Sequence, residues 1–388
     1  MPFFDDAVYA ERRERVADAV RRAGRGPAVL GTGAEFEYLT GSAASSHERL
    51  TALVFGTDGG VTAIAPLTDI ESLRKGASLT DVPLRGWRDG DNPYALAAQT
   101  AGVTGAGAGP ATPVQLGASL TADHVFGLRD AFGAAGAAGA AGGAGAAGTV
   151  EPLSAEVREC FLVKDDAEIA QLARAAAAID RVHARVPALL VAGTTEEAVA
   201  AQLHELILEE HRSVDFVIVG SAENGANPHH DFSPRVLREG DPVVVDIGGT
   251  LDSGYHSDCT RTYLVGEAAE TGGEFAAAFD AVHRAHRAAL SAARPGMTAG
   301  ELDAVARDVI EEAGYGEYFT HRLGHGIGLA GHEAPFIIGG GETVLREHMA
   351  FSIEPGVYLP GAFGVRIEDI VVLEADGARA LNQQPRGL

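Results

Sequence analysis

The stretch DPVVVDIGGTLDSGYHSDCTRTYLV, residues 241–265, indicates how the later part of the chain folds. An apolar run precedes LDSG, and Thr, Tyr, Leu and Val follow it, which is the pattern of two strands joined by a turn. With the turn centred on Asp252, Asp246 and Asp258 are expected to lie opposite each other, unless a bulge shifts the register. The stretch therefore predicts a β-hairpin that carries a facing pair of acids.

A second stretch, FSIEPGVYLPGAFGVRIEDIVVL at residues 351–373, has the same character and turns at Pro360 and Gly361. A hairpin centred on Gly361 sets Glu354 opposite Glu368. Facing like charges destabilise a sheet, and ionised acids are costly to bury without compensation. A proton shared between carboxylates would relieve the repulsion, and so would bound cations; four carboxylates balance the charge of two divalent ions.

Three imidazoles stand in the glycine-rich stretch THRLGHGIGLAGHEAP, residues 320–335, which contains His321, His325 and His332. Its glycines disfavour a helix and let a histidine approach a crowded group of carboxylates. One or two neutral imidazoles would complete the coordination, and the others would be left for proton transfer or oxyanion contact. Hard oxygen ligands with one nitrogen favour manganese, cobalt or zinc. A dinuclear metal site therefore accounts for all three stretches together.

The composition restricts the class of protein and its partners. A length of 388 residues suits two domains, at roughly 150 residues per domain. The net charge of −24 argues against nucleic-acid and anionic-membrane partners, which need basic surfaces. The start lacks the basic end and apolar run of a signal peptide, and no segment approaches the ~20 apolar residues of a membrane span. With two cysteines, we expect no disulfide framework and a cytoplasmic location.

A Gly/Ala segment, residues 133–148, has too little side chain to build a core and is expected near a domain boundary, as a flexible loop or a frayed helix. Before it, GPAVLGTGAEFEYLTG and TALVFGTDGGVTAIAP have the character of short apolar strands between helices. They predict an α/β N-terminal domain over residues 1–155. After it, KDDAEIAQLARAAAAIDRVHARV has the spacing of an amphipathic helix and opens a second domain over residues 156–388.

The second domain contains an internal repeat. The stretches from Ile179 and from Phe279 both run helix, Gly-containing turn, Thr, acid, helix. We interpret them as two structural half-domains, each of helices plus a hairpin, that meet around a shared centre; a chance likeness of two Ala-rich helices is the alternative. The capping-box spacing occurs in both copies, and two histidines of the second copy are expected on a solvated helix face. These residues are Thr194 with Glu197, Thr298 with Glu301, and His283 with His286.

The motifs DIGGTLDSGYHSDCTRTY, HRLGHGIGLAGHE, SIEPGVY and VRIED resemble those of the pita-bread metallopeptidases: methionine aminopeptidase, aminopeptidase P and prolidase. The resemblance begins at about Lys164 and implies an α+β fold of two domains, with pseudo-twofold half-domains in the C-terminal one. EFEYLTG looks like part of the creatinase-type accessory domain, which methionine aminopeptidases usually lack. The Xaa-Pro peptidase branch therefore fits better.

The resemblance also implies roles for individual residues. NPHHDFS is similar to the segment that holds a substrate-facing histidine, which would be His229, with His230 as the alternative. One extra residue separates the two aspartates compared with most relatives, which leaves the register of that hairpin open. The metal ligands would be Asp246, Asp258 (bridging), His325, Glu354 and Glu368, with His321 and His332 as accessory histidines and Arg366 as an arginine beside them.

The function implied is hydrolysis of the peptide bond before proline, in a dipeptide, by hydroxide that two divalent ions generate at neutral pH. Glu354 would accept the water's proton, and His229 and His332 would bind the substrate carbonyl or oxyanion. His321 and Arg366 would orient the ligands. The ions would be Mn²⁺, with Co²⁺ or Zn²⁺ as alternatives, and the protein a homodimer. An aminopeptidase P that takes longer peptides, a metal-free relative and a non-catalytic binding module are the other interpretations.

Overall fold

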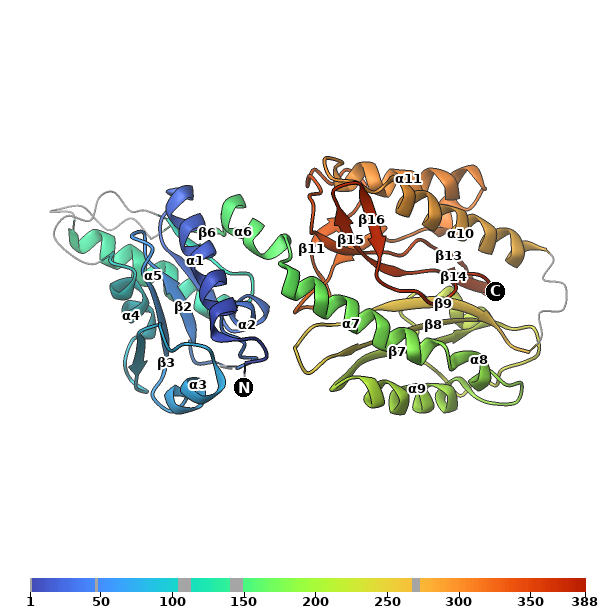
Figure 1. The fold of residues 1–388 in the computed structure, drawn as a ribbon, viewed down its shortest axis with the longest axis horizontal. Coiled ribbons are helices and arrows are strands. Elements are labelled where there is room, and N and C mark those ends of the chain that lie inside the picture. Colours follow the sequence, from blue (N-terminus) through green and yellow to red (C-terminus); the bar gives the residue numbers. More distant parts are fainter. Residues whose placement is uncertain (1, 46–47, 104–112, 140–148, 267–272) are drawn as a thin grey trace. The chain divides into compact units, whose positions relative to one another are not determined.

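The computed structural model describes residues 2–45, 48–103, 113–139, 149–266 and 273–388 (Figure 1). Two compact units make up the chain, Met1–Phe161 and Leu162–Leu388. The boundary expected between residues 155 and 156 lies at the start of helix α6 (Ala155–Leu162). Helix α5 (Ala122–Gly139) includes the beginning of the Gly/Ala segment, and residues 140–148 of that segment lie outside the described residues.

The first unit is a six-stranded mixed sheet with helices around it, in the strand order β4-β3-β2-β1-β5-β6. Strand β1 is antiparallel to β2 and parallel to β5. Buried apolar side chains of β2, β5 and α5, such as Val54, Val114 and Leu128, form one core cluster. The strands are β1 (Ala28–Gly31), β2 (Ala52–Phe55), β3 (Val61–Pro66), β4 (Leu84–Trp87), β5 (Val114–Leu116) and β6 (Val150–Pro152). The other helices are α1 (Asp6–Ala23), α2 (Ala34–Thr40), α3 (Ile70–Gly76) and α4 (Pro93–Thr100).

The second unit begins with a half-domain of helices and a three-stranded antiparallel sheet, in the order β7-β8-β9. Its first helix starts with a capping box, because Asp165 accepts from the Glu168 amide while the Glu168 side chain accepts from the Asp165 amide. The elements are α7 (Asp166–His183), α8 (Val186–Leu189), α9 (Glu196–Glu210), β7 (Ser213–Ser221), η1 (Ala222–Ala226), β8 (Pro242–Thr250) and β9 (Cys259–Leu264).

The other half-domain contains a five-stranded sheet in the order β11-β10-β12-β15-β16 and the two-stranded hairpin β13-β14. Its helices are α10 (Glu274–Ala292), α11 (Ala299–Glu312) and η2 (Gly316–Tyr318). Its strands are β10 (Gly324–Gly326), β11 (Glu333–Ile337), β12 (Ala350–Ile353), β13 (Gly356–Leu359), β14 (Phe363–Arg366), β15 (Asp369–Glu374) and β16 (Gly377–Ala380).

The strands of the two half-domains lie between their helices, with α7, α8 and α9 on one side and α10 and α11 on the other (Figure 1). Strand β14 of the second half contacts β8 and β9 of the first. The capping box expected at Thr298 and Glu301 is present. The one expected at Thr194 and Glu197 is wrong, because α9 starts one residue later, with Thr195 capping the Ala198 amide.

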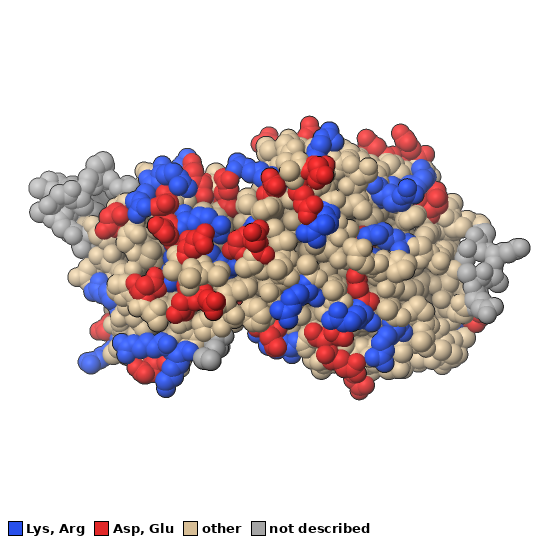
Figure 2. Space-filling view, viewed as in Figure 1, with Lys and Arg blue, Asp and Glu red and all other residues tan. Residues whose placement is uncertain are grey.

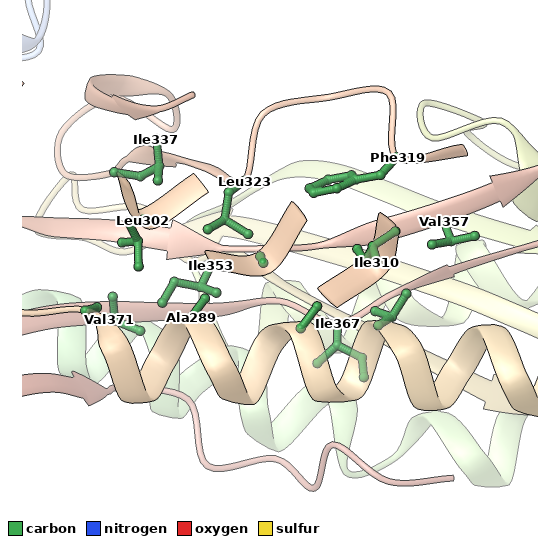
Figure 3. Close-up of a cluster of buried hydrophobic side chains, with 14 of the residues drawn as sticks. Ala289, Leu302, Ile310, Phe319, Leu323, Ile337, Ile353, Val357, Ile367 and Val371 are labelled. Carbon is green, nitrogen blue, oxygen red and sulfur yellow. The ribbon is translucent and has the colours of Figure 1, made fainter. Parts of the chain in front are cut away.

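The core of the second half fixes which way the strands face the centre. Ile353 and Ile367 belong to the buried apolar cluster under α10, together with Ala289 (Figure 3). Burial of each such isoleucine side chain stabilises the fold by roughly 1.5–3 kcal/mol. Since side chains alternate along a strand, the acids that follow them, Glu354 and Glu368, are directed to the opposite face.

The two hairpins differ in register. In β13-β14, Val357 pairs with Val365, so the turn is centred on Gly361, which has φ 71° and satisfies the expectation. In β8-β9, Asp246 pairs with Thr260. The expected facing of Asp246 and Asp258 is therefore wrong: continuing the same register places Asp258 opposite Gly248 and diagonal to Asp246, on the same sheet face.

Acidic and basic side chains are interspersed on both units over the face that Figure 2 shows. Within the described part of the chain, none of the helices combines the length and the apolar character that a bilayer crossing requires. The excess of 54 acidic over 30 basic side chains is thus carried by a mixed surface, at least on this face.

Candidate metal centre and active site

Acids from both half-domains converge in the second unit. Ligand atoms of Asp246, Asp258 and Glu368 lie within 4.8 Å of one another, and so do those of His325, Glu354 and Glu368. The exposed fractions of Asp246, Asp258 and Glu368 are 8%, 4% and 1%. The structure therefore brings together all five residues that the resemblance implied as metal ligands.

A glycine makes room for the aspartates on the first hairpin. Gly248 stands across from Asp258, and a Cβ on it would lie 2.6 Å from the Ser257 carbonyl oxygen and 2.5 Å from the Phe216 ring. The missing side chain leaves the sheet face open between the two diagonal carboxylates. Residue type at position 248 thus helps Asp246 and Asp258 to approach one another.

Two hydroxyls hold the glutamates of the second half. The Thr260 hydroxyl donates to Glu368 Oε2 at 2.7 Å, and the Glu368 amide donates to the Thr260 carbonyl at 3.0 Å. The Ser352 hydroxyl donates to Glu354 Oε1 at 3.0 Å. Thr260 belongs to β9, so its bonds to Glu368 join the two half-domains at the cluster.

His325 presents one ring nitrogen to the carboxylates. Its Nδ1–H donates to the Gly326 carbonyl at 3.1 Å, which leaves Nε2 with a lone pair. Nε2 lies 3.3 Å from Glu354 Oε1 and 3.7 Å from Asp258 Oδ2. Burial lowers the pKa of His325 to about 3, and His332 lowers it further, so the ring is neutral at physiological pH. A neutral imidazole held through its other nitrogen is the usual form of a metal-ligating histidine.

The crowded carboxylates disfavour full ionisation by themselves. Burial raises the pKa of Asp258 well above its usual range, and the charges of Asp246 and Glu354 add to this. Burial, and then Asp258, also raise the pKa of Glu368. Burial raises the pKa of Glu354 to about 7 although the Arg366 cation opposes it. Positive charge in the cluster would remove this conflict.

Two buried oxygens test whether metal ions fit. Asp246 Oδ1 and Glu368 Oε1 have no hydrogen-bond partner among the described residues. A buried polar atom without a partner is rare and costly. Four carboxylates and an imidazole with a free lone pair form a donor set suited to manganese, cobalt or zinc. The residues therefore fit a pair of divalent ions.

A hydrogen-bonded chain leads away from the cluster. Arg366 donates from Nη2 to Asp246 Oδ2 and from Nη1 to the Tyr358 hydroxyl, both at 2.6 Å. That hydroxyl in turn donates to His321 Nε2 at 2.9 Å, because His321 Nδ1–H is bound to the Arg322 carbonyl at 2.7 Å. Burial, and then Arg366, lower the pKa of His321 to about 4. His321 and Arg366 thus orient groups around the cluster.

His332 lies against the cluster from the exposed side. Its ring centroid is 3.7 Å from that of His325, and its ring nitrogen forms a group with ligand atoms of Asp258 and His325. Burial lowers the pKa of His332, and the Arg322 and His229 charges lower it further. The carbonyl of Pro228, just before His229, accepts from Arg366 Nη2 at 3.4 Å. These contacts place His229 and His332 at the same opening.

His230 points elsewhere. Its Nε2 lies 2.9 Å from Glu196 Oε2, on helix α9, whereas the neighbouring His229 is exposed. Of the two histidines that the sequence left open, His229 is therefore the one available to a ligand.

Comparison with known proteins decides the family. The model of metallopeptidase family M24 matches residues 170–375. The chain belongs to the M24 metallopeptidase family.

Relatives of this M24 chain match over nearly its whole length. The "Probable dipeptidase PepE" of Mycobacterium tuberculosis is 47% identical over 389 residues, which cover 99% of this chain and 97% of the relative. The Xaa-Pro dipeptidase of Lactobacillus helveticus is 34% identical and covers 90% of this chain and 91% of its own. The crystal structure of dipeptidase PepE from Mycobacterium ulcerans superimposes with a TM-score of 0.89 at 47% identity, over 99% of this chain and 98% of that one.

Sequence reasoning missed two residues of this M24 site, Tyr358 and Thr260. Both could have been found by strand alternation. Tyr358 lies four residues after Glu354, on the face that also carries Arg366, and Thr260 lies two residues after Asp258. The signal was present, but a tyrosine and a threonine on a strand are too common to stand out.

Proposed function

We propose that this metallopeptidase hydrolyses the peptide bond preceding proline in Xaa-Pro dipeptides. The observation that carries the proposal is the convergence of four carboxylates and His325 from both half-domains, with two carboxylate oxygens left without a partner among the described residues. The Lactobacillus helveticus relative, named an Xaa-Pro dipeptidase, supports the substrate class.

The metal ions would be held by the five clustered residues. When bound, two divalent ions lower the pKa of a shared water and polarise the scissile carbonyl. Manganese is the expected metal, and cobalt or zinc suits the same donors. The proposed ligands are Asp246, Asp258, His325, Glu354 and Glu368.

The remaining chemistry is assigned to the chain's own residues. Glu354 accepts the proton of the attacking water and later delivers it to the leaving nitrogen of proline. His229 and His332, at the opening of the site, donate hydrogen bonds to the substrate carbonyl and to the oxyanion that develops from it. Arg366 and His321, linked through Tyr358, keep Asp246 and the pocket wall in place.

Two further features belong to this proposal. Cys160 and Cys259 are both free and buried, which suits a reducing cytoplasm. The Xaa-Pro branch that the sequence resembles is commonly homodimeric, so we propose a homodimer, which light scattering of the purified protein would test.

The experiment uses full-length protein stripped with a chelator and reloaded with Mn²⁺. We expect turnover of Ala-Pro, little turnover of Ala-Pro-Pro, and none of Ala-Ala, each returning only when the metal is restored. Preference for Ala-Pro-Pro would instead identify an aminopeptidase P. Absence of metal binding, or of hydrolysis of both proline peptides, would contradict the proposal.

A further inference from the structure

A carboxylate outside the metal cluster is completely enclosed. Glu196, the first residue of α9, has an exposed fraction of 0%. Its Oε1 accepts from the Ser221 amide at 2.7 Å and from the Ser221 hydroxyl at 2.5 Å. Its Oε2 accepts from His230 Nε2 at 2.9 Å and from the Ser233 hydroxyl at 2.6 Å, and Asn224 Nδ2 lies 3.0 Å from it. A buried charge with this many donors is well compensated.

The donors come from both ends of one segment. Ser221 ends strand β7, and His230 and Ser233 follow the turn that begins at Asn227. Between them lies His229, whose amide bonds the Asn227 side chain at 3.2 Å. Glu196 therefore holds residues 221–233 at each end while the exposed His229 side chain between them makes no printed bond to it.

The adjacent histidines have different tasks. Because His229 and His230 share a peptide bond, a His230 ring fixed on Glu196 restricts the backbone from which His229 projects. The Pro228 carbonyl, bonded to Arg366, restricts the same backbone from the other side. Neither contact binds a substrate, so each acts through His229.

We propose that Glu196 is a positioning residue that acts through His230 and sets the orientation of His229 toward the substrate. This inference rests on the proposed function, in which His229 binds the carbonyl. A misplaced catalytic group can lower the rate by as much as about 10²-fold, even when the change lies outside the site of the chemistry.

Glu196→Gln is the central variant because it keeps the shape and removes the charge. Its amide nitrogen would face the Ser221 amide or Asn224, which can only donate there, or would force His230 into its other tautomer. We expect kcat/KM for Ala-Pro to fall roughly 10- to 100-fold, mainly in kcat, with metal content unchanged. Glu197→Gln is the matched control, since Glu197 is the next residue on α9 and is exposed.

Two comparisons separate positioning from a general loss of stability. In a His229→Ala background, Glu196→Gln should lower kcat/KM by less than about twofold, because the residue it positions is gone. His230→Gln, which keeps a donor near the ring Nε2, should retain most activity, whereas His230→Ala should match Glu196→Gln. An undiminished additional loss in the His229→Ala background would overturn the proposal.

Hydrogen exchange gives a measurement that does not depend on turnover. In Glu196→Gln and His230→Ala, amides of residues 221–233 should exchange about tenfold faster, while those of the β8-β9 hairpin stay as in the parent protein. Unchanged exchange in residues 221–233, or faster exchange throughout the unit, would count against anchoring by Glu196. Should the parent protein cleave no proline peptide, the proposed function fails, yet these rates still decide whether Glu196 holds the segment.

Discussion

The two half-domains of the second unit place their acids by different routes. In the first, Asp258 stands across from Gly248 and reaches Asp246 on the diagonal. In the second, continuing the strand register beyond β13-β14 places Glu354 directly opposite Glu368. The shared requirement is the sheet face on which the acids lie, because strand alternation fixes the face even where the pairing shifts.

Each half also supplies a buried acid that holds a histidine-bearing segment. In the first half it is Glu196, whose partners are neutral donors. In the second it is Asp303, which accepts from the Leu323 amide at 3.0 Å and binds Arg307 at 2.8 Å. A neutral network can be altered while the fold persists, whereas a charged pair leaves an uncompensated ion when one member is removed.

The largest effect should follow removal of one acid from either hairpin. Asp258→Asn and Glu368→Gln should each lower kcat/KM for Ala-Pro on the order of 10³-fold and reduce the bound metal, because each removes a ligand charge from the shared cluster. Metal analysis and steady-state assays test this, with the exposed Asp252 of the first turn changed to Asn as control. Near-normal activity in either variant would mean that one hairpin is dispensable.

The second largest effect should fall on stability, through Asp303→Asn. This change leaves the Arg307 guanidinium, which also bonds the Phe319 and His321 carbonyls at 3.0 and 2.9 Å, without its carboxylate. We expect a loss of about 3 kcal/mol in the free energy of unfolding, seen as a Tm lowered by roughly 5–10 °C. Asp308→Asn, at an exposed position on the same helix, should leave Tm unchanged. A Tm effect of Glu196→Gln as large as that of Asp303→Asn would erase the distinction between the halves.

A smaller effect should come from the bond that crosses between the halves. Tyr358→Phe removes the hydroxyl that accepts from Arg366 and donates to His321. With Arg366 less firmly held against Asp246, kcat/KM should fall about tenfold, which corresponds to about 1.4 kcal/mol. Tyr318→Phe, at a tyrosine with a side chain the solvent reaches, serves as the control. Equal kinetics of Tyr358→Phe and the parent protein would show that the chain of hydrogen bonds is not needed.

The sequence predicts the sheet faces better than the contacts made across them. Apolar runs and the turn at Gly361 set the second hairpin, and the metal-ligand candidates follow from its alternation. The first register could not be derived, because the extra turn residue is absorbed between Thr250 and His256, which form an isolated bridge. Likewise, His286 was expected in solvent but is buried 3.1 Å from Asp369, a distant partner that no local pattern reveals.

Buried histidines sharpen the comparison once more, with the smallest expected effect. His183 of α7 lies between neutral groups: Nε2–H donates to the Cys259 carbonyl and Nδ1 accepts from the Tyr263 hydroxyl, both at 2.9 Å. In the other half, His286 faces the Asp369 carboxylate instead. Burial, and then Arg261, lower the pKa of His183 to about 3.

This lowered pKa makes stability depend on pH in a defined direction. Between pH ~6.5 and about 3 the unfolded chain binds a proton at His183 that the folded chain does not, so the contribution is complete above pH ~6.5 and is lost as the pH falls. The slope from this group is about 1.4 kcal/mol per pH unit. Urea unfolding at pH 7, 6 and 5 should show this slope in the parent protein and in His204→Gln, and a weaker pH dependence in His183→Gln. Parallel curves for the parent protein and His183→Gln would mean that the His183 ring takes up a proton in the folded state as readily as in the unfolded chain.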